Sequence, residues 1–136
     1  MSQSVLDHIT DTLVHELKAH GIDLLYYGAY GTKSRYLKMD DDMLHSIRIS
    51  DHPGKQHLKY RYEIGPHISQ QHCVMKQGFP CHKYPADAIN QLLTDILKER
   101  DTRLRTYGPA KYAYYRQKSV EENRNKKGFW SKARHI

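Results

Sequence analysis

The segment MLHSIRISDHPGKQHLKYRYEI, residues 43–64, contains two runs in which apolar and polar residues alternate. A period of two is typical of a β-strand with one face on a core and one in water. Between the runs, residues 50–55 are rich in turn formers, because Asp can bond its own backbone and Gly permits a positive φ. The segment therefore predicts a long antiparallel hairpin at the centre of a small sheet. The inward residues are Ile47, Ile49, Leu58, Tyr60, Tyr62 and Ile64, and the basic outer face is Arg48, Lys59 and Arg61.

The segments around this hairpin predict an α+β domain. Residues 4–20 carry apolar side chains at steps of three and four, which is typical of an amphipathic helix. Pro85 suits the first position of a second such helix, which ends near Tyr107. We expect a small antiparallel sheet of about four or five strands, packed by these two helices. Further strands are predicted at residues 22–30, 34–39 and 68–76.

Charge divides the chain into a neutral body and a basic tail. Residues 1–100 hold twelve Lys or Arg and twelve Asp or Glu, whereas residues 101–136 hold ten and three. The whole excess of +7 therefore lies in the last quarter, which points to a polyanionic partner. We predict a core domain at 1–105 and a basic tail at 106–136. Within the tail, residues 109–127 form a helix that lacks a wide apolar stripe and is therefore loosely attached.

Cations and aromatic rings are interleaved along the tail. Cations pair with phosphates and flat rings stack on unpaired bases, which suits single-stranded or structured RNA better than a groove-reading DNA helix. If about five phosphates of a single strand are contacted, log K falls with log[salt] at a slope of roughly −3.5. The alternative is an ordinary solvated helix whose tyrosines pack back on the sheet. The predicted nucleic-acid or partner contacts are Arg103, Arg105, Lys111, Tyr112, Tyr115, Arg116, Lys118, Arg124, Lys126, Lys127, Trp130, Lys132 and Arg134 of the tail region, with Arg48, Lys59 and Arg61 of the hairpin.

Two histidines and two cysteines define a candidate zinc site: His72, Cys73, Cys81 and His82. Thiolate and imidazole are ligands that zinc prefers, and the turn between the two pairs could bring them together. However, the spacing is not that of paired CxxC knuckles, and adjacent residues of a strand point to opposite faces. We therefore expect two small buried thiols and exposed imidazoles, with no bound metal or other cofactor.

Two groups of residues have the chemical types found in catalytic sites. Ser50, Asp51 and His52 are consecutive, and because consecutive side chains diverge, a turn is the preferred interpretation over a triad. The aspartates at 40–42, with Asp51, could hold a nuclease metal, but three successive aspartates are typical of a solvated turn. A metal- or histidine-dependent nuclease is therefore an alternative, and we expect no enzyme activity.

Composition favours a protein of the cytoplasm. The mean hydropathy is −0.84, and no apolar run approaches the length that crosses a bilayer. The N-terminal segment is acidic and amphipathic, unlike a signal peptide, and two cysteines suit a compartment that keeps thiols reduced. The Tyr-rich strands are compatible with a monomer or with a dimer formed through an open sheet edge.

The runs SRYLK, residues 34–38, and IRISDHPGKQHLKYRY, residues 47–62, resemble a motif of small phage and prophage proteins. In those proteins an [IL]R-[IL]S-[DN]H strand end recurs beside a Tyr-rich strand, and a family of type II-A anti-CRISPR proteins that inhibits Cas9 is among them. The resemblance covers residues 34–100 and implies a strand–turn–strand–helix core with a flexible basic extension. In this chain the basic extension follows the core, whereas in that family it precedes the core.

The resemblance implies a phage or mobile-element protein that acts in a bacterial host cell. Its partner would be a Cas9-type ribonucleoprotein, bound through the guide RNA or through the channel that holds the RNA phosphates. It would inhibit by binding, without chemistry of its own. A general phage RNA- or DNA-binding protein is the alternative.

Overall fold

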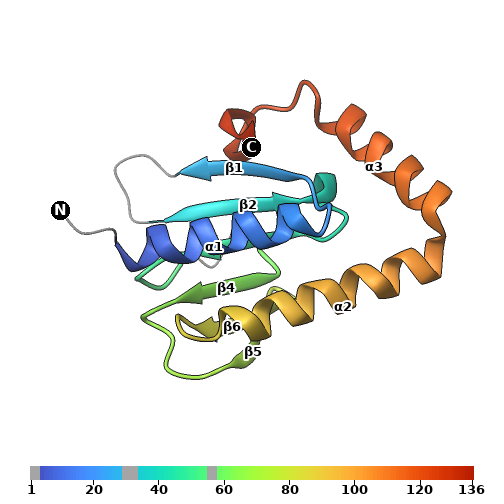
Figure 1. Cartoon of the computed structure of the whole chain (residues 1–136). Helices are drawn as coiled ribbons and strands as arrows, with labels where there is room; N and C mark the ends of the chain where they lie inside the picture. Colours follow the sequence, from blue (N-terminus) through green and yellow to red (C-terminus); the bar gives the residue numbers. More distant parts are fainter. Residues whose placement is uncertain (1–3, 29–33, 55–57) are drawn as a thin grey trace.

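The structure is a computed structural model that describes residues 4–28, 34–54 and 58–136. Within these ranges it contains three α-helices and a seven-stranded, mostly antiparallel sheet, which confirms the predicted α+β class but with a larger sheet than expected. The elements, shown in Figure 1, are α1 (Val5–Ala19), β1 (Leu24–Gly28), β2 (Arg35–Met39), the 3-10 helix η1 (Asp40–Asp42), β3 (Ser46–Ile49), β4 (Tyr62–Gly65), β5 (His72–Lys76), β6 (Phe79–Pro85), α2 (Ile89–Tyr107), α3 (Pro109–Asn123), the 3-10 helix η2 (Phe129–Lys132) and β7 (Arg134–His135).

The strands of the sheet lie in the order β5-β6-β4-β3-β2-β1-β7. β4 is parallel to both of its neighbours, β3 and β6, whereas the other pairs are antiparallel. The sequence did not predict β6 or β7. A tight turn joins β5 to β6 through Gln77 (φ 51°) and Gly78 (φ 81°), two left-handed residues of the kind that suit a two-residue hairpin.

The predicted central hairpin is wrong. β3 and β4 are parallel, with Arg48 opposite Glu63, and parallel strands require a long crossover in place of a tight turn. The part of this connection that the structure describes is residues 50–54 and 58–61. Strict alternation would place Tyr60 and Tyr62 on the same face of the sheet. In the structure they lie on opposite faces, since Tyr62 packs in the main core and Tyr60 in a smaller cluster on the other side. A period of two identifies extended chain, and it does not fix the direction or the partner of that chain.

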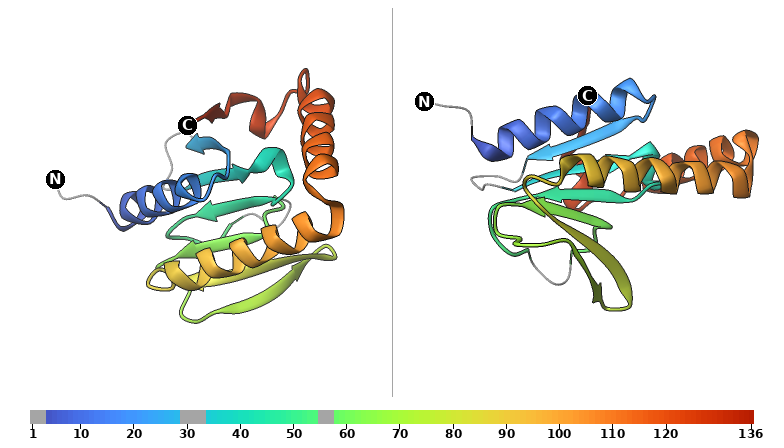
Figure 2. Two further views of the ribbon diagram at one scale, coloured as in Figure 1. Left: turned by 45° about the vertical axis from the view of Figure 1, so that its right-hand side comes forward. Right: turned by 60° about the horizontal axis from the view of Figure 1, so that its bottom comes forward.

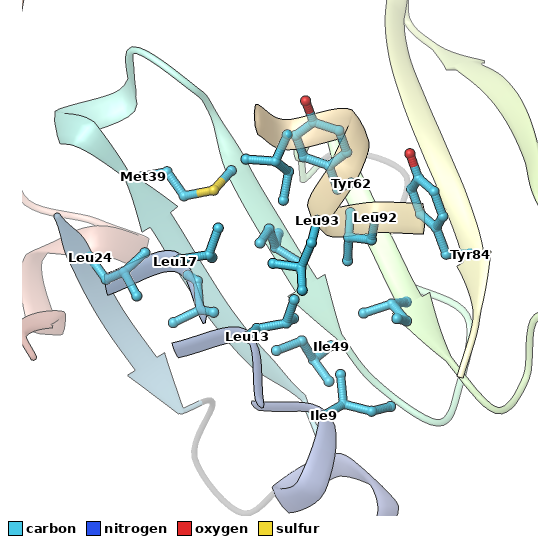
Figure 3. Close-up of a cluster of buried hydrophobic side chains, with 14 of the residues drawn as sticks. Ile9, Leu13, Leu17, Leu24, Met39, Ile49, Tyr62, Tyr84, Leu92 and Leu93 are labelled. Atoms are coloured by element: carbon cyan, nitrogen blue, oxygen red, sulfur yellow. The ribbon is translucent and has the colours of Figure 1, made fainter. Parts of the chain in front are cut away.

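α1 and α2 lie side by side over one face of the sheet and bury the main core (Figures 1 and 2). Ser4 caps α1 by accepting a hydrogen bond from the N–H of Asp7 at 3.1 Å. Leu13 and Leu17 of α1 are 0% exposed, as their spacing predicts. Figure 3 shows these side chains against the strands and beside Leu92 and Leu93 of α2, with Leu24, Met39, Ile49, Tyr62 and Tyr84 of the sheet in the same cluster.

α2 begins later than the sequence predicts. Pro85 ends β6 opposite Gly65, and the helix begins at Ile89. The fixed φ of proline suits the end of a strand as well as the first turn of a helix, so its position alone misled the prediction. α2 ends at Tyr107 as expected, and Gly108 (φ 80°) separates it from α3. No helix in the described ranges is long and apolar enough to pass through a membrane.

The opposite face of the sheet carries a smaller cluster built on Tyr36, Tyr60 and Cys81. The crossover at residues 50–61 brings Tyr60 to this face. At Gly54 a Cβ would lie 2.2 Å from the Tyr60 hydroxyl oxygen, so only a residue without a side chain fits there. This second face is therefore covered by irregular chain, whereas the first face is covered by helices.

Candidate nucleic-acid interface

α3 is anchored to the body of the protein, contrary to the expectation of a loosely attached helix. Tyr112, a predicted nucleic-acid contact, is 5% exposed, and its hydroxyl donates to Asp40 Oδ2 at 2.6 Å. Arg116 Nε donates to Asp41 Oδ2 at 3.0 Å, and the same guanidinium pairs with Asp23. Tyr112 and Arg116 therefore hold α3 against η1, and Tyr112 is not available to a nucleic acid.

The aspartates of η1 serve this anchoring. They have left-handed backbone, with φ of 48°, 53° and 76° at Asp40, Asp41 and Asp42, a conformation that Asp tolerates better than most residues. Burial raises the pKa of Tyr112, and its bond to Asp40 raises that pKa further, so the hydroxyl remains a donor. Two of the four carboxylates that the nuclease alternative assigned to a metal, those of Asp40 and Asp41, therefore accept hydrogen bonds from α3.

Residues 124–136 form a strap that returns to the sheet beyond α3 (Figure 1). β7 pairs with β1, with Arg134 opposite Tyr26, and the N–H of Ile136 donates to the Leu24 carbonyl at 3.2 Å. The guanidinium of Arg134 lies 5.4 Å from the centre of the Tyr26 ring. The predicted basic tail thus supplies an edge strand of the sheet, and the predicted boundary before it falls inside α2.

Trp130 joins the strap to the second face of the sheet. Its half-buried ring meets the Tyr36 ring edge-on, with 6.3 Å between ring centres. The ammonium of Lys38 on β2 lies 4.6 Å from the centre of the Trp130 ring, a cation–π distance. Trp130 therefore has a structural role together with any binding role.

A cavity of about 480 Å³ lies between the strap, the end of α3 and the first two strands. We call it the strap cavity. Its lining includes one aromatic ring and four flexible cations. One cation comes from β2, and the other three come from the chain after α3. These residues are Lys38, Arg124, Lys126, Lys127 and Trp130.

The electrostatics of the strap cavity favour an anion. Burial lowers the pKa of Lys38, and the nearby charge of Lys126 acts in the same direction against the carboxylates of Asp42 and Asp41. Asp41 is the acid that lines the cavity, and it already accepts a hydrogen bond from Arg116 at 2.8 Å. The cavity is lined by four cations, Lys38, Arg124, Lys126 and Lys127, against this one acid, so its net charge is positive.

A second hollow lies between α2, α3 and η1 and carries exposed tyrosine rings. Tyr115 is 41% exposed and packs edge-on against Tyr107, with 5.4 Å between ring centres. Tyr114 is 56% exposed, and its ring centre lies 5.5 Å from that of Tyr115. Lys118 lines the same hollow. Exposed rings beside a cation are the arrangement that stacks unpaired bases.

The other predicted contacts fall into two groups. Arg61 and Arg103 are half-buried and approach one imidazole, that of His45. The exposed ones are Lys59, Arg105, Lys111, Tyr115, Lys118, Arg124, Lys126, Lys127, Lys132 and Arg134.

Arg48 is buried, contrary to its predicted place on a basic outer face. It is 1% exposed, and its Nη1 lies 2.5 Å from Oε2 of Glu63, which is 0% exposed. Lys83 Nζ lies 2.6 Å from the other carboxylate oxygen, so the three charges form a ladder across β3, β4 and β6. Burial raises the pKa of Glu63, but hydrogen bonds and charge from Lys83 and Arg48 outweigh it, and the net pKa is lowered. The carboxylate therefore stays ionised and holds both cations.

The segment Ser50–His52 forms a turn, as the preferred interpretation states, although it does not close a hairpin. The His52 N–H donates to Ser50 Oγ at 3.2 Å. The sequence did not predict Ser34, whose Oγ lies 3.3 Å from His52 Nε2 and accepts a hydrogen bond from Arg48 Nη2 at 3.1 Å. The imidazole thus meets a hydroxyl from the start of β2, a partner that only the tertiary structure identifies.

The candidate zinc ligands are divided between the two faces of the β5–β6 pair. Cys73 is exposed and lies opposite His82, whereas Cys81 is buried and lies opposite Val74. Burial raises the pKa of the Cys81 thiol to about 11, which disfavours the thiolate that zinc requires. His72 adjoins Cys73 on the edge strand. In the described part of the chain, no group of three or more His, Cys, Asp or Glu side chains is placed to hold a metal ion.

No protein-family model matches the chain, and neither the curated proteins nor the solved structures compared with it include a match.

Proposed function

We propose that the protein binds single-stranded or structured RNA, without catalysis, through the strap cavity and the exposed cations of α3. The observation that carries the proposal is the set of side chains around that cavity, where Trp130 stands beside Lys38, Lys126 and Lys127. The cations suit backbone phosphates and the ring offers a stacking surface for a base. Tyr114 and Tyr115 extend the same combination along α3.

Charge segregation supports an extended contact. α3 and the strap, residues 109–136, hold eight Lys or Arg and two Asp or Glu, which is +6 of the net charge of +7, whereas residues 1–100 are neutral. A strand that followed the exposed residues Lys111 and Lys118 toward Lys126 would meet cations from α3 to the strap cavity. Such a contact is dominated by counterion release and is therefore sensitive to salt.

The experiment is a titration of single-stranded RNA by fluorescence anisotropy over a salt series. For the unmodified protein we expect a slope of log K against log[salt] of roughly −3.5, which corresponds to about five phosphates. Replacing Lys126 and Lys127 together by Gln removes two cations and should make the slope less steep by about 1.4. The matched control is Lys98→Gln, an exposed cation of α2, which should leave the slope unchanged. Absence of binding at low salt, or equal slopes for both variants, contradicts the proposal.

The resemblance to type II-A anti-CRISPR proteins supports a narrower form of this function. In that form the target is an RNA-loaded Cas9-type effector, and the protein blocks it by occupying guide RNA or the surrounding phosphate channel. The test is target cleavage by guide-loaded Cas9 with increasing amounts of the protein. Inhibition that the Lys126→Gln/Lys127→Gln variant loses supports the narrower form. Undiminished cleavage at excess protein, with RNA binding intact, leaves the general RNA-binding function.

A further inference from the structure

Three basic side chains from distant parts of the chain converge where β3 and β4 begin. His45 immediately precedes β3, Arg61 immediately precedes β4, and Arg103 is on α2. Arg61 Nη2 lies 2.8 Å and Arg103 Nη2 lies 3.3 Å from the same atom, His45 Nε2. Because a guanidinium can only donate, Nε2 is the acceptor and the imidazole is neutral.

The positive charge at this point is only partly balanced. Arg103 Nε donates to Glu99 at 3.0 Å, so one of the two guanidinium groups has a carboxylate partner. Among the described residues Arg61 forms no ion pair, and its Nε is enclosed without a hydrogen-bond acceptor. An enclosed donor without an acceptor is costly, and two guanidinium groups beside one imidazole repel each other.

The convergence has an aromatic wall and remains open to solvent. The Phe79 ring lies 5.1 Å from the Arg61 guanidinium and meets the His45 ring edge-on at 5.5 Å. His45, Arg61, Phe79 and Arg103 are each half-buried, so a small ligand can reach them. His45 also has left-handed backbone, with φ of 63°, a strained conformation of the kind that often accompanies functional sites.

We propose that His45, Arg61 and Arg103 form a binding site for a phosphate monoester. Two guanidinium forks match the oxygens of a phosphate, because a phosphate monoester has three terminal oxygens that can accept from both forks whereas a carboxylate has two. The bound oxygens would accept from the guanidinium N–H groups that now share His45 Nε2. The inference does not rest on the proposed RNA binding, since the strap cavity is lined by other residues. The monoester has two sources, a free nucleotide or the 5′-phosphate of a strand.

Protonation of His45 supplies a signature of this site. Burial, and to a lesser extent the charges of Arg61 and Arg103, lowers the pKa of His45 to about 4 against the opposing effect of Glu99. A bound phosphate adds negative charge and therefore raises this pKa. Because the imidazole binds a proton more readily with phosphate present, protonation of His45 favours phosphate binding as pH falls through the pKa of the complex, whereas protonation of the phosphate dianion at about pH 6 acts in the opposite direction.

The experiment is a titration of the full chain with inorganic phosphate at pH 7, followed by the imidazole signals of His45 in NMR spectra. We expect saturable shifts at His45 and a raised His45 pKa in the complex. Arg61→Gln should weaken phosphate binding more than tenfold, because a charge-assisted pair is lost. The control is Arg105→Gln, an exposed arginine of the same helix as Arg103, which should bind phosphate as the unmodified protein does.

Further measurements separate the alternatives. Arg103→Gln repeats the test if Arg61→Gln fails to fold. His45→Asn keeps a residue that tolerates the left-handed backbone, and it removes the contribution of His45 to the pH dependence while that of the phosphate remains. Stronger binding of 5′-phosphorylated than of 5′-hydroxyl RNA assigns the site to a strand end, and stronger binding of a nucleoside monophosphate assigns it to a nucleotide. Equal phosphate affinity in Arg61→Gln and Arg105→Gln, or equal responses to phosphate and acetate, overturns the site. The Lys126→Gln/Lys127→Gln variant should bind phosphate normally, so failure of the RNA-binding proposal is distinguishable.

Discussion

The two faces of the sheet are built on different principles. The helix-covered face is an ordinary apolar core, in which the side chains of α1 and α2 meet those of the strands (Figure 3). The second face buries charges and hydroxyls: Arg48, Glu63, Ser34 and Ser50 are each less than 5% exposed. The first face obtains its stability from apolar area, whereas the second depends on every polar group having a partner.

This difference decides where function can reside. A buried apolar core has no groups that bind a polyanion, whereas the second face is bordered by the strap and its cations. Trp130 of the strap packs against the cluster on this face and also lines the strap cavity. Substitutions on the two faces should therefore differ in the size and in the pH dependence of the stability that they remove.

Glu63→Ala should be the most destabilising single change. It leaves Arg48 buried without its carboxylate and frees Lys83, and removing one partner of a buried ion pair typically costs about 3–5 kcal/mol. The measurement is the free energy of unfolding in urea. Glu63→Gln is the matched control for shape, and it should lower stability by a similar amount because the charge is lost.

Lowering the pH should weaken the same ladder of Arg48, Glu63 and Lys83. The pKa of Glu63 is lowered in the folded state, so its contribution is present above the ordinary carboxyl pKa and is lost as pH falls through the folded value. We therefore expect the difference between the unmodified protein and Glu63→Gln to shrink in acid. A loss below about 1 kcal/mol at neutral pH in Glu63→Ala would mean that the ladder is solvated, and the contrast between the faces would fail.

Leu13→Ala tests the helix-covered face. Leu13 is 0% exposed in the middle of α1, and truncation of a buried leucine costs about 3 kcal/mol through lost burial and the cavity left behind. The unfolding free energy should fall by this amount at all pH values, unlike that of the Glu63 variants. A pH-dependent loss would show that the two faces are energetically coupled.

The sequence predicted the first face well and the second face poorly. Helical periodicity identified α1 and α2, because the buried face of a helix is visible in the spacing of apolar residues within that one segment. The direction of β4 could not be predicted, since alternation is the same for parallel and antiparallel neighbours. Arg48 was placed in water for this reason: its burial depends on Glu63 and Lys83, which become its neighbours only through the parallel register.

The candidate interface shows the same limit. Composition identified the cationic region, and Lys126 and Lys127 do line a cavity. Tyr112 is the same type of residue as its exposed neighbours Tyr114 and Tyr115, and only its contact with Asp40 distinguishes it as an anchor. The convergence of Arg61 and Arg103 on one imidazole was equally invisible, because it joins residues far apart in the sequence.

Tyr112→Phe should have the smallest effect of the three stability changes and should act locally. It removes the hydroxyl that donates to Asp40, and a hydrogen bond to a charged group contributes about 2 kcal/mol. Because Tyr112 joins α3 to η1, the loss should appear as faster hydrogen exchange in α3, by about 30-fold for amides that exchange through local opening. Tyr114→Phe, an exposed position on the same helix, should leave exchange unchanged. Equal exchange in both variants would mean that Arg116 alone anchors α3. In that case the position of the strap, and with it the cavity on the second face, would depend on the ion pairs of Arg116 with Asp23 and Asp41.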